Sequence, residues 1–117
     1  MKVLCICTAN LQRSVTLEAL LNATPGQEAR SAGTHPSQGR HRITENDLTW
    51  ADVVVVFEPD HVRHLRNHFY AFWKRAKPIN LDVPDEYTAF TPELIEILGE
   101  RIQRRFAITL SPMEAIR

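Results

Sequence analysis

The chain has 117 residues, of which 44% are hydrophobic and 24% are charged, and this size fits one compact domain spanning residues 1–117. Its 14 lysines and arginines balance its 14 aspartates and glutamates, which excludes the broad basic surface that non-specific nucleic-acid binding needs. The longest apolar runs, such as residues 53–57, are far shorter than the ~18 residues of a membrane span. We therefore expect a soluble, cytoplasmic protein that binds neither nucleic acid nor membrane.

The sequence contains only two cysteines, Cys5 and Cys7. Their spacing is too tight for an ordinary structural disulfide, which excludes a disulfide framework. No compact group of cysteines and histidines has the spacing of a zinc site. The sequence signal for a zinc site is therefore weak, and we predict that one of the thiols does chemistry.

The first predicted element is a strand over residues 2–7, an apolar run without alternation, as expected for a central strand covered on both faces. After a polar break, good helix formers run from Ser14 to Asn22 and stop before Pro25. A weaker second strand is predicted over residues 28–32.

The middle of the chain combines a helix start with the clearest strand. Thr44 is followed three residues later by Asp47, a pattern that predicts a capping box and a short helix. Four valines and a phenylalanine at residues 53–57 predict a buried strand. One helix is predicted to follow from Pro59, because apolar residues recur there at helical spacing. The members of this stripe are Val62, Leu65, Phe69 and Phe72.

The last predicted elements are a fourth strand over residues 77–81, a polar loop over residues 82–90 and a helix. The helix start has a hydroxyl at Thr91, a proline at Pro92 and an acid next to it, all typical of helix N-termini. Strands that alternate with helices predict a parallel sheet with helices on both sides. Ligands of such sheets bind beyond the carboxyl ends of the strands.

The loop after the first strand carries the strongest chemical pattern. Cys7 stands at the strand end, and Arg13 and Ser14 follow after five residues, where the next helix begins. Backbone amides that converge at a helix N-terminus form an anion site, and an arginine can hold two oxygens of a tetrahedral anion. A cysteine facing such a site is expected to ionise easily and to be nucleophilic. The alternative is that Cys7 is a small buried core residue.

Five blocks of sequence in chain order support the chemical interpretation. The blocks are Cys7, Asn10, Arg13 and Ser14 in the loop, then residues 31–34, 43–47, 53–58 and 85–88. Together they resemble the low-molecular-weight protein tyrosine phosphatases, particularly a short bacterial branch. The fold that this resemblance implies is a three-layer α/β/α domain with a four-stranded parallel sheet in the flavodoxin-like order 2-1-3-4.

The resemblance implies a cysteine-dependent phosphatase that hydrolyses phosphotyrosine proteins or small aryl phosphates through a phosphocysteine intermediate. Cys7 would be the nucleophile, and Asp85 would protonate the leaving phenol and then activate the water. Arg13 and the loop amides would hold the phosphoryl group, and inorganic phosphate or sulfate would occupy the same loop. The implied phosphate-binding residues are Thr8, Ala9, Asn10, Leu11, Gln12, Arg13 and Ser14.

The same resemblance implies that no metal or cofactor is required, and it implies further residue roles. Asn10 and Ser31 would brace the loop, the Ser14 hydroxyl would hydrogen-bond the thiolate, and Tyr87 would form an aromatic wall for the substrate. Asp82 is a rival acid three residues before Asp85, but we favour the interpretation that its side chain caps the turn after the fourth strand.

Departures from the family keep two alternatives open. Gln12 stands where many members carry a second cysteine that protects the first, so that redox switch is absent. Ala9 and Val15 replace a glycine and a proline of the family, which leaves open a non-catalytic oxyanion-binding module. An arsenate reductase-like enzyme is the other alternative, but it needs further cysteines, and only Cys5 remains.

Three histidines fall on one face of the helix predicted from Pro59. They are His61, His64 and His68. We predict that they lie at a solvated or partly packed edge of that helix rather than bind a metal.

Overall fold

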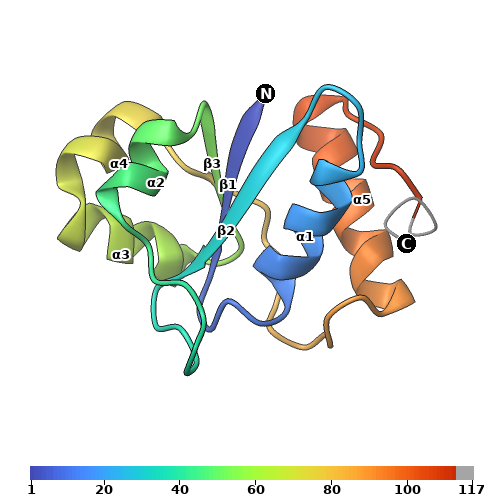
Figure 1. Ribbon diagram of the computed structural model, residues 1–117, viewed down its shortest axis with the longest axis horizontal. Coiled ribbons are helices and arrows are strands. Elements are labelled where there is room, and N and C mark those ends of the chain that lie inside the picture. Colours follow the sequence, from blue (N-terminus) through green and yellow to red (C-terminus); the bar gives the residue numbers. More distant parts are fainter. Residues whose placement is uncertain (113–117) are drawn as a thin grey trace.

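The computed structural model describes residues 1–112, in which four strands form one parallel sheet between two layers of helices (Figure 1). The strands are β1 (Lys2–Cys7), β2 (Glu28–Gly33), β3 (Val53–Val56) and β4 (Ile79–Asn80). Their order in the sheet is β2-β1-β3-β4, and every pair is parallel. The predicted sheet and its order are confirmed.

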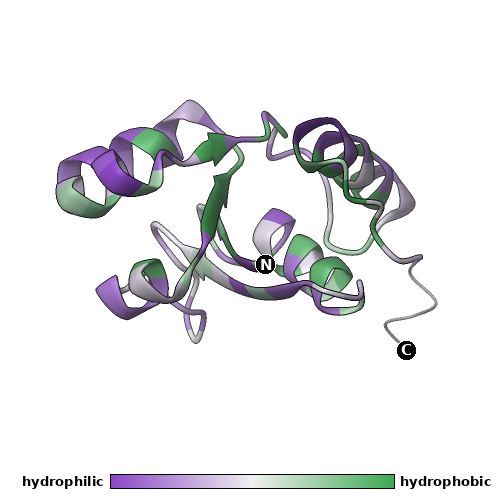
Figure 2. Cartoon of the chain, turned by 90° about the horizontal axis from the view of Figure 1, so that it is seen from above, coloured by the Kyte–Doolittle hydropathy of each residue, from purple (hydrophilic) through white to green (hydrophobic). Residues whose placement is uncertain are grey.

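Helices cover both faces of the sheet, which confirms the three layers. On one face lie α1 (Arg13–Asn22) and α5 (Pro92–Phe106). On the other lie α2 (Glu45–Trp50), α3 (Pro59–His68) and α4 (Tyr70–Ala76). Seen from above, β1 and β3 in the middle of the sheet are among the most hydrophobic parts of the chain (Figure 2). Within residues 1–112, no helix combines the length and the hydrophobicity that crossing a membrane requires.

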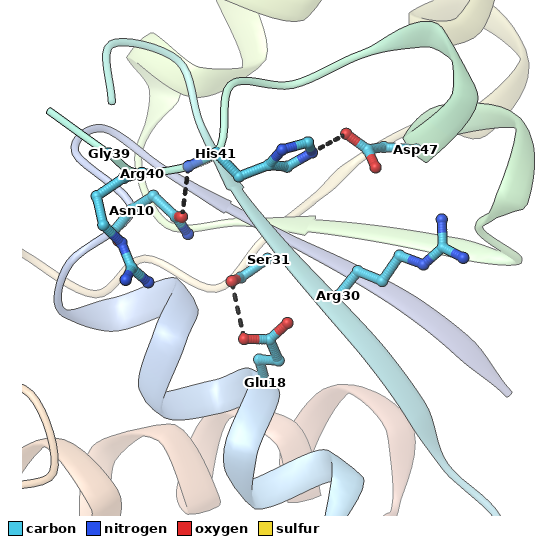
Figure 3. Close-up of a pocket in the computed structure, with 8 residues that line it drawn as sticks. All are labelled: Asn10, Glu18, Arg30, Ser31, Gly39, Arg40, His41 and Asp47. Carbon is cyan, nitrogen blue, oxygen red and sulfur yellow. Dashed lines mark hydrogen bonds and ion pairs between the residues drawn. The ribbon is translucent and has the colours of Figure 1, made fainter. Parts of the chain in front are cut away.

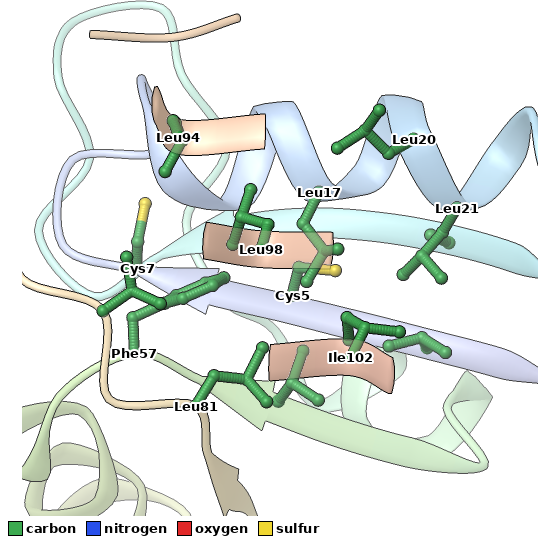
Figure 4. Packing of buried hydrophobic residues seen from close by; sticks show 14 residues of the cluster. Cys5, Cys7, Leu17, Leu20, Leu21, Phe57, Leu81, Leu94, Leu98 and Ile102 are labelled. Atoms are coloured by element: carbon green, nitrogen blue, oxygen red, sulfur yellow. The ribbon is translucent and has the colours of Figure 1, made fainter. Parts of the chain in front are cut away.

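The larger core cluster lies between the sheet and the α1–α5 layer (Figure 4). Both cysteines belong to it, and leucine and isoleucine side chains of α1 and α5 pack over them. Burying one such side chain contributes about 1.5–3 kcal/mol. Because β1 is buried on both faces beyond Lys2, its sequence shows no alternation. This packing fixes the end of β1, from which the loop with Cys7 departs.

The predicted helix starts are confirmed in atomic detail. Thr44 Oγ1 accepts a hydrogen bond from Asp47 N at 3.1 Å, and Asp47 Oδ2 accepts one from Thr44 N at 3.0 Å. At α5, Thr91 Oγ1 accepts from Leu94 N, with Pro92 in the first turn. These local bonds satisfy amides that a helix N-terminus leaves without a partner.

The single helix predicted from Pro59 is wrong, because the chain breaks at Phe69. This residue has φ −139° and ψ 48° and separates α3 from α4. Phe69, Phe72 and Trp73 all pack against the core cluster on that face of the sheet, so the apolar spacing continues across the break. A stripe of apolar residues therefore marks the buried side but does not reveal the break.

The fourth strand is shorter than the predicted residues 77–81. Lys77 has a positive φ of 48° and ends α4, which delays the strand to Ile79. The pairing with β3 continues one residue further, because Leu81 N donates to Val56 O at 2.8 Å. The chain then turns toward the carboxyl edge of the sheet.

Candidate active site

The phosphate loop, residues 7–14, joins the end of β1 to the first turn of α1. It lies where the strand order reverses, between β2 and β3, the usual position of ligand sites in such sheets. The segment after β2 runs beside it and donates to its carbonyl oxygens. These bonds are Thr34 N to Cys7 O (3.0 Å), His35 N to Thr8 O (2.9 Å) and Ser37 N to Ala9 O (3.1 Å).

These bonds leave the loop amides available. Among the hydrogen bonds of residues 1–112, none has a backbone amide of residues 9–12 as its donor. A run of free amides at a helix N-terminus is the arrangement that binds oxyanions.

Gly33 permits the close approach of the two segments. A Cβ atom at this position would lie 2.6 Å from Thr8 O and 3.1 Å from Asn10 N. Both contacts are to the backbone of the phosphate loop, so no side-chain rotation could relieve them. Any other residue here would push the loop away from β2.

Asn10 braces the loop from inside. Its φ of 56° is in the left-handed region, which asparagine tolerates better than most residues. Its side chain accepts from His41 N at 3.2 Å and donates to Ser14 Oγ at 3.0 Å, and its carbonyl accepts from Arg40 Nε at 2.8 Å. These contacts join Asn10 to the start of α1 and to the segment after β2.

The Cys7 thiol lies within hydrogen-bond distance of the Ser14 hydroxyl, which a bond from Asn10 orients. Cys7 Sγ is 2.9 Å from Ser14 Oγ. Because Asn10 Nδ2 donates to that same oxygen, the hydroxyl proton of Ser14 can point to the sulfur. When Cys7 is a thiolate it can only accept, so Ser14 stabilises the charged form.

Cys7 faces a small cavity of about 160 Å³. The side chains and backbone of Cys7, Ala9, Leu11, Gln12, Arg13 and Asp85 line it. The structure thus brings the predicted nucleophile, arginine and acid to one place.

The Arg13 guanidinium is anchored through Nη1, whereas its Nε–H group has no partner among the described residues. The residue is only 1% exposed, and Nη1 donates to Val83 O at 2.7 Å and pairs with Glu58 Oε2 at 3.0 Å. Nε is buried and has no partner among the described residues. A buried donor of this kind needs an acceptor, and a bound oxyanion would supply it.

Asp85 rather than Asp82 lines the pocket. The Asp85 carboxylate is 60% exposed, and its Oδ1 lies 3.8 Å from Arg13 Nη2. Asp82 borders a different cavity beside α5. The turn at Asp82 is capped by Asn80, whose Oδ1 accepts from Asp82 N at 2.9 Å, so the expectation that the Asp82 side chain caps it is wrong.

Ser31 lies in a second, larger cavity of about 480 Å³, on the β2 side of the phosphate loop (Figure 3). Its hydroxyl donates to Glu18 Oε1 at 2.9 Å. Nearby, His41 Nε2 contacts Asp47 Oδ2 at 2.7 Å. Ser31 therefore bonds to α1 instead of bracing the loop directly.

Tyr87 is half-buried and packs against the larger core cluster. It is not among the residues that line the pocket of Cys7. The apolar side chain at that pocket is Leu11, which is 41% exposed. The aromatic wall predicted from Tyr87 thus has no counterpart in this arrangement.

His61 is a site residue that the sequence analysis missed. It is 1% exposed, and its Nδ1 accepts from Phe57 N and Glu58 N, both at 3.2 Å. The proton must then be on Nε2, which donates to Thr8 Oγ1 at 3.0 Å. Burial, followed by the charge of Arg13, lowers the pKa of His61 to about 4.

The prediction that His61 lies at a partly exposed edge is therefore wrong. The signal that could have found it is a glutamate at the end of the clearest strand with a histidine three residues later. In the structure these two residues form a reciprocal cap at the start of α3. Residues 1–112 contain no group of three or more His, Cys, Asp or Glu side chains placed to hold a metal ion.

Cys5 is a second free thiol beneath the site. Burial is the main cause that raises its pKa well above the ordinary value, and the nearby Glu18 and Cys7 add to the effect. A thiol that stays protonated is a poor partner for disulfide exchange.

Comparison with known proteins relates the fold of this chain to solved structures of phosphatases. No protein-family model matches the sequence, and no curated protein matches it. The solved structure of a low-molecular-weight protein tyrosine phosphatase from T. tengcongensis matches with a TM-score of 0.68 and 25% identity, covering 86% of this chain and 92% of that one. The chain has the low-molecular-weight tyrosine phosphatase fold.

Two further structures share this fold. The tyrosine phosphatase Wzb from Escherichia coli K30, in complex with phosphate, has a TM-score of 0.69 and 20% identity over 88% of this chain and 94% of its own. The YwlE arginine phosphatase from Geobacillus stearothermophilus has a TM-score of 0.65 and 21% identity over 88% and 93%. The resemblance found in the five sequence blocks is thus confirmed at the level of the fold.

Proposed function

We propose that the protein is a phosphatase that hydrolyses phosphotyrosine or small aryl phosphates through a phosphocysteine intermediate. One observation carries the proposal: Cys7, Arg13 and Asp85 line one pocket, and the buried Nε of this arginine has no partner among residues 1–112. A module that only bound oxyanions would need neither a nucleophile nor an acid there.

In the first step, the Cys7 thiolate attacks phosphorus, so that the P–S bond forms while the bond to the aryl oxygen breaks. Asp85 is protonated and gives its proton to the leaving oxygen. The charge on the transferring group is stabilised by Arg13 Nε and by the free amides of residues 9–12. Ser14 holds the thiolate until it attacks.

In the second step, water attacks the phosphocysteine. The Asp85 carboxylate takes a proton from that water, the P–S bond breaks, and the Cys7 thiolate and inorganic phosphate are released. Asp85 thereby regains the proton that it gave up, and the enzyme returns to its starting state without a cofactor.

The rim of the pocket supports an aryl substrate. Leu11 is exposed there and offers an apolar contact that suits a phenyl ring better than a cationic guanidinium. Because a neighbour in fold is an arginine phosphatase, phosphoarginine is the substrate to compare with phosphotyrosine. Arsenate reduction is not favoured, because Cys5 is the only other cysteine and it is buried. We place the enzyme in the cytoplasm, where free thiols stay reduced.

The test is release of p-nitrophenol from p-nitrophenyl phosphate by wild type, Cys7→Ser and Asp85→Asn. Cys7→Ser is expected to lose all measurable turnover but still bind phosphate, and Asp85→Asn to lose about 100-fold. The same assay with phosphotyrosine and phosphoarginine peptides separates the two substrate classes. If wild type binds phosphate and releases no p-nitrophenol, the chain is an oxyanion-binding module and the proposal is wrong.

A further inference from the structure

The acid loop, residues 82–91, is tied to α1 by two side chains whose roles are otherwise unexplained. Ala89 N donates to Gln12 Oε1, and Phe90 N donates to Thr16 Oγ1 at 3.1 Å. The two acceptors are four residues apart in the first turn of α1, and so they lie on one face of the helix. Two neighbouring amides of the acid loop therefore meet two neighbouring acceptors.

The direction of both bonds is fixed. Gln12 is the N-cap residue of α1 and makes no side-chain capping bond, so its amide is free to reach across to the acid loop. The Thr16 hydroxyl donates its single proton to Gln12 O at 2.7 Å, and it can only accept from Phe90. Both side chains thus present oxygen lone pairs to the acid loop.

The segment that these bonds hold contains a residue in an unfavourable backbone conformation. Phe90 has a φ of 62°, a left-handed conformation that is unfavourable for a bulky residue. Asp85, five residues earlier, is mostly exposed, and among the described residues its side chain makes no hydrogen bond or ion pair besides the 3.8 Å approach of its Oδ1 to Arg13 Nη2. Its position depends on the two ends of its loop, one of which is Val83 O bound by Arg13.

We propose that Gln12 and Thr16 are positioning residues that hold the acid loop so that Asp85 can give its proton to the leaving group. The inference rests on the proposed phosphatase activity. It assigns a purpose to Gln12, which stands at the position where many members of the family that the sequence resembles carry a second cysteine. Position 12 here serves proton delivery, whereas it serves protection of the nucleophile there.

The test removes each acceptor while keeping the size of the side chain. Gln12→Met and Thr16→Val are compared with Thr16→Ser, which keeps the hydroxyl, and with Asp85→Asn. The readout is kcat/KM for a series of aryl phosphates with increasingly basic leaving phenols, because kcat/KM reports the step in which Asp85 acts as acid. Inhibition by inorganic phosphate is measured in parallel.

Gln12→Met and Thr16→Val are expected to lose about tenfold with phenyl phosphate, a part of the loss that removal of a general acid produces. They should lose less than twofold with dinitrophenyl phosphate, whose leaving group needs no proton. Asp85→Asn should give the same pattern with a steeper slope, Thr16→Ser should behave as wild type, and phosphate inhibition should stay within twofold.

An equal loss for all leaving groups, or weaker phosphate inhibition, would place the defect in the phosphate loop and overturn the inference. Hydrogen exchange gives a second readout that is independent of turnover. The amides of Ala89 and Phe90 should exchange faster in Gln12→Met and Thr16→Val respectively, and unchanged exchange contradicts the inference. If wild type itself hydrolyses no aryl phosphate, the proposed function fails first and the inference fails with it.

Discussion

The phosphate loop and the acid loop line the same pocket, but neighbouring segments hold them to different degrees. Carbonyl oxygens of the phosphate loop are taken up by the segment after β2, and both Asn10 and Arg13 are buried. The acid loop is mostly exposed around Asp85. It contacts the phosphate loop and α1 through Val83, Ala89 and Phe90.

This difference matches what each loop has to do. Stabilising a charged transition state requires donors that do not reorganise during the reaction, and burial keeps them fixed. A general acid has to regain or lose protons to solvent, and exposure allows this. A substitution can therefore impair phosphate binding without impairing proton transfer by Asp85, or the reverse.

The largest effect is expected from a substitution that displaces the buried phosphate loop. Gly33→Ala places a Cβ against the backbone of the phosphate loop, and a shift of about 1 Å in such a site lowers activity about 100-fold. We expect this loss in kcat/KM for every leaving group, together with weaker phosphate binding by calorimetry.

Gly99→Ala is the matched control for that substitution. Gly99 lies within α5, and a Cβ there meets nothing within 4 Å. The variant should keep full activity and be more stable by about 0.5–1 kcal/mol, because alanine favours helix over glycine. Equal activity of both variants would show that Gly33 is not needed for the shape of the loop.

The next prediction is that His61 makes the stability of the folded protein depend on pH. Its folded pKa is about 4 against an ordinary value of 6.5, so the unfolded chain binds the proton more readily. Stability is therefore full above pH 6.5 and decreases as the pH falls toward 4, by about 3 kcal/mol in total. Urea unfolding at pH 7.5, 6, 5 and 4.5 measures the slope.

His61→Asn isolates this contribution. The Oδ1 of asparagine can take the position of Nδ1 and accept from Phe57 N and Glu58 N, but the side chain does not titrate. The variant should be less stable at pH 7.5, because it loses the bond to Thr8, and its stability should fall less steeply below pH 6.5. A slope equal to that of wild type would assign the acid sensitivity to other groups.

The smallest effect is expected on kcat/KM, from removing the charge of Glu58 but not from removing that of the nearby Asp60. Glu58→Gln weakens the anchor of Arg13 from a charged to a neutral hydrogen bond, which corresponds to about a tenfold loss of kcat/KM. Asp60→Asn removes an ion pair with Arg63 in which both partners are exposed, and such pairs contribute less than ~1 kcal/mol. Kinetics should therefore separate the two variants, and equal kcat/KM values would mean that Glu58 does not orient Arg13.

The parts of the fold that local chemistry determines could be predicted from the sequence. The unbroken apolar run of β1, the capping box at Thr44 and the start of α5 at Thr91 each depend on residues a few positions apart. The site loop was also predictable, because Cys7, Arg13 and the helix start are contiguous. The structure places all of these where the sequence indicates.

Contacts between distant segments could not be predicted in this way. The bond from Ala89 to Gln12 joins residues 77 positions apart, and no local pattern announces it. The burial of His61 depends on its fit beneath Thr8, 53 positions away. The break between α3 and α4 at Phe69 could not be predicted, because the apolar residues on both sides of it keep the helical spacing.

The buried Nε of Arg13 has a consequence for the end of the catalytic cycle. A buried donor without an acceptor is unfavourable by about 1–3 kcal/mol, and the phosphate released by hydrolysis satisfies this donor as well as the substrate does. Phosphate should therefore raise the melting temperature of the protein and compete with substrate. In the proposed mechanism, product inhibition therefore follows from the same atom that would bind the substrate, and the rate at which phosphate leaves would set an upper limit on turnover.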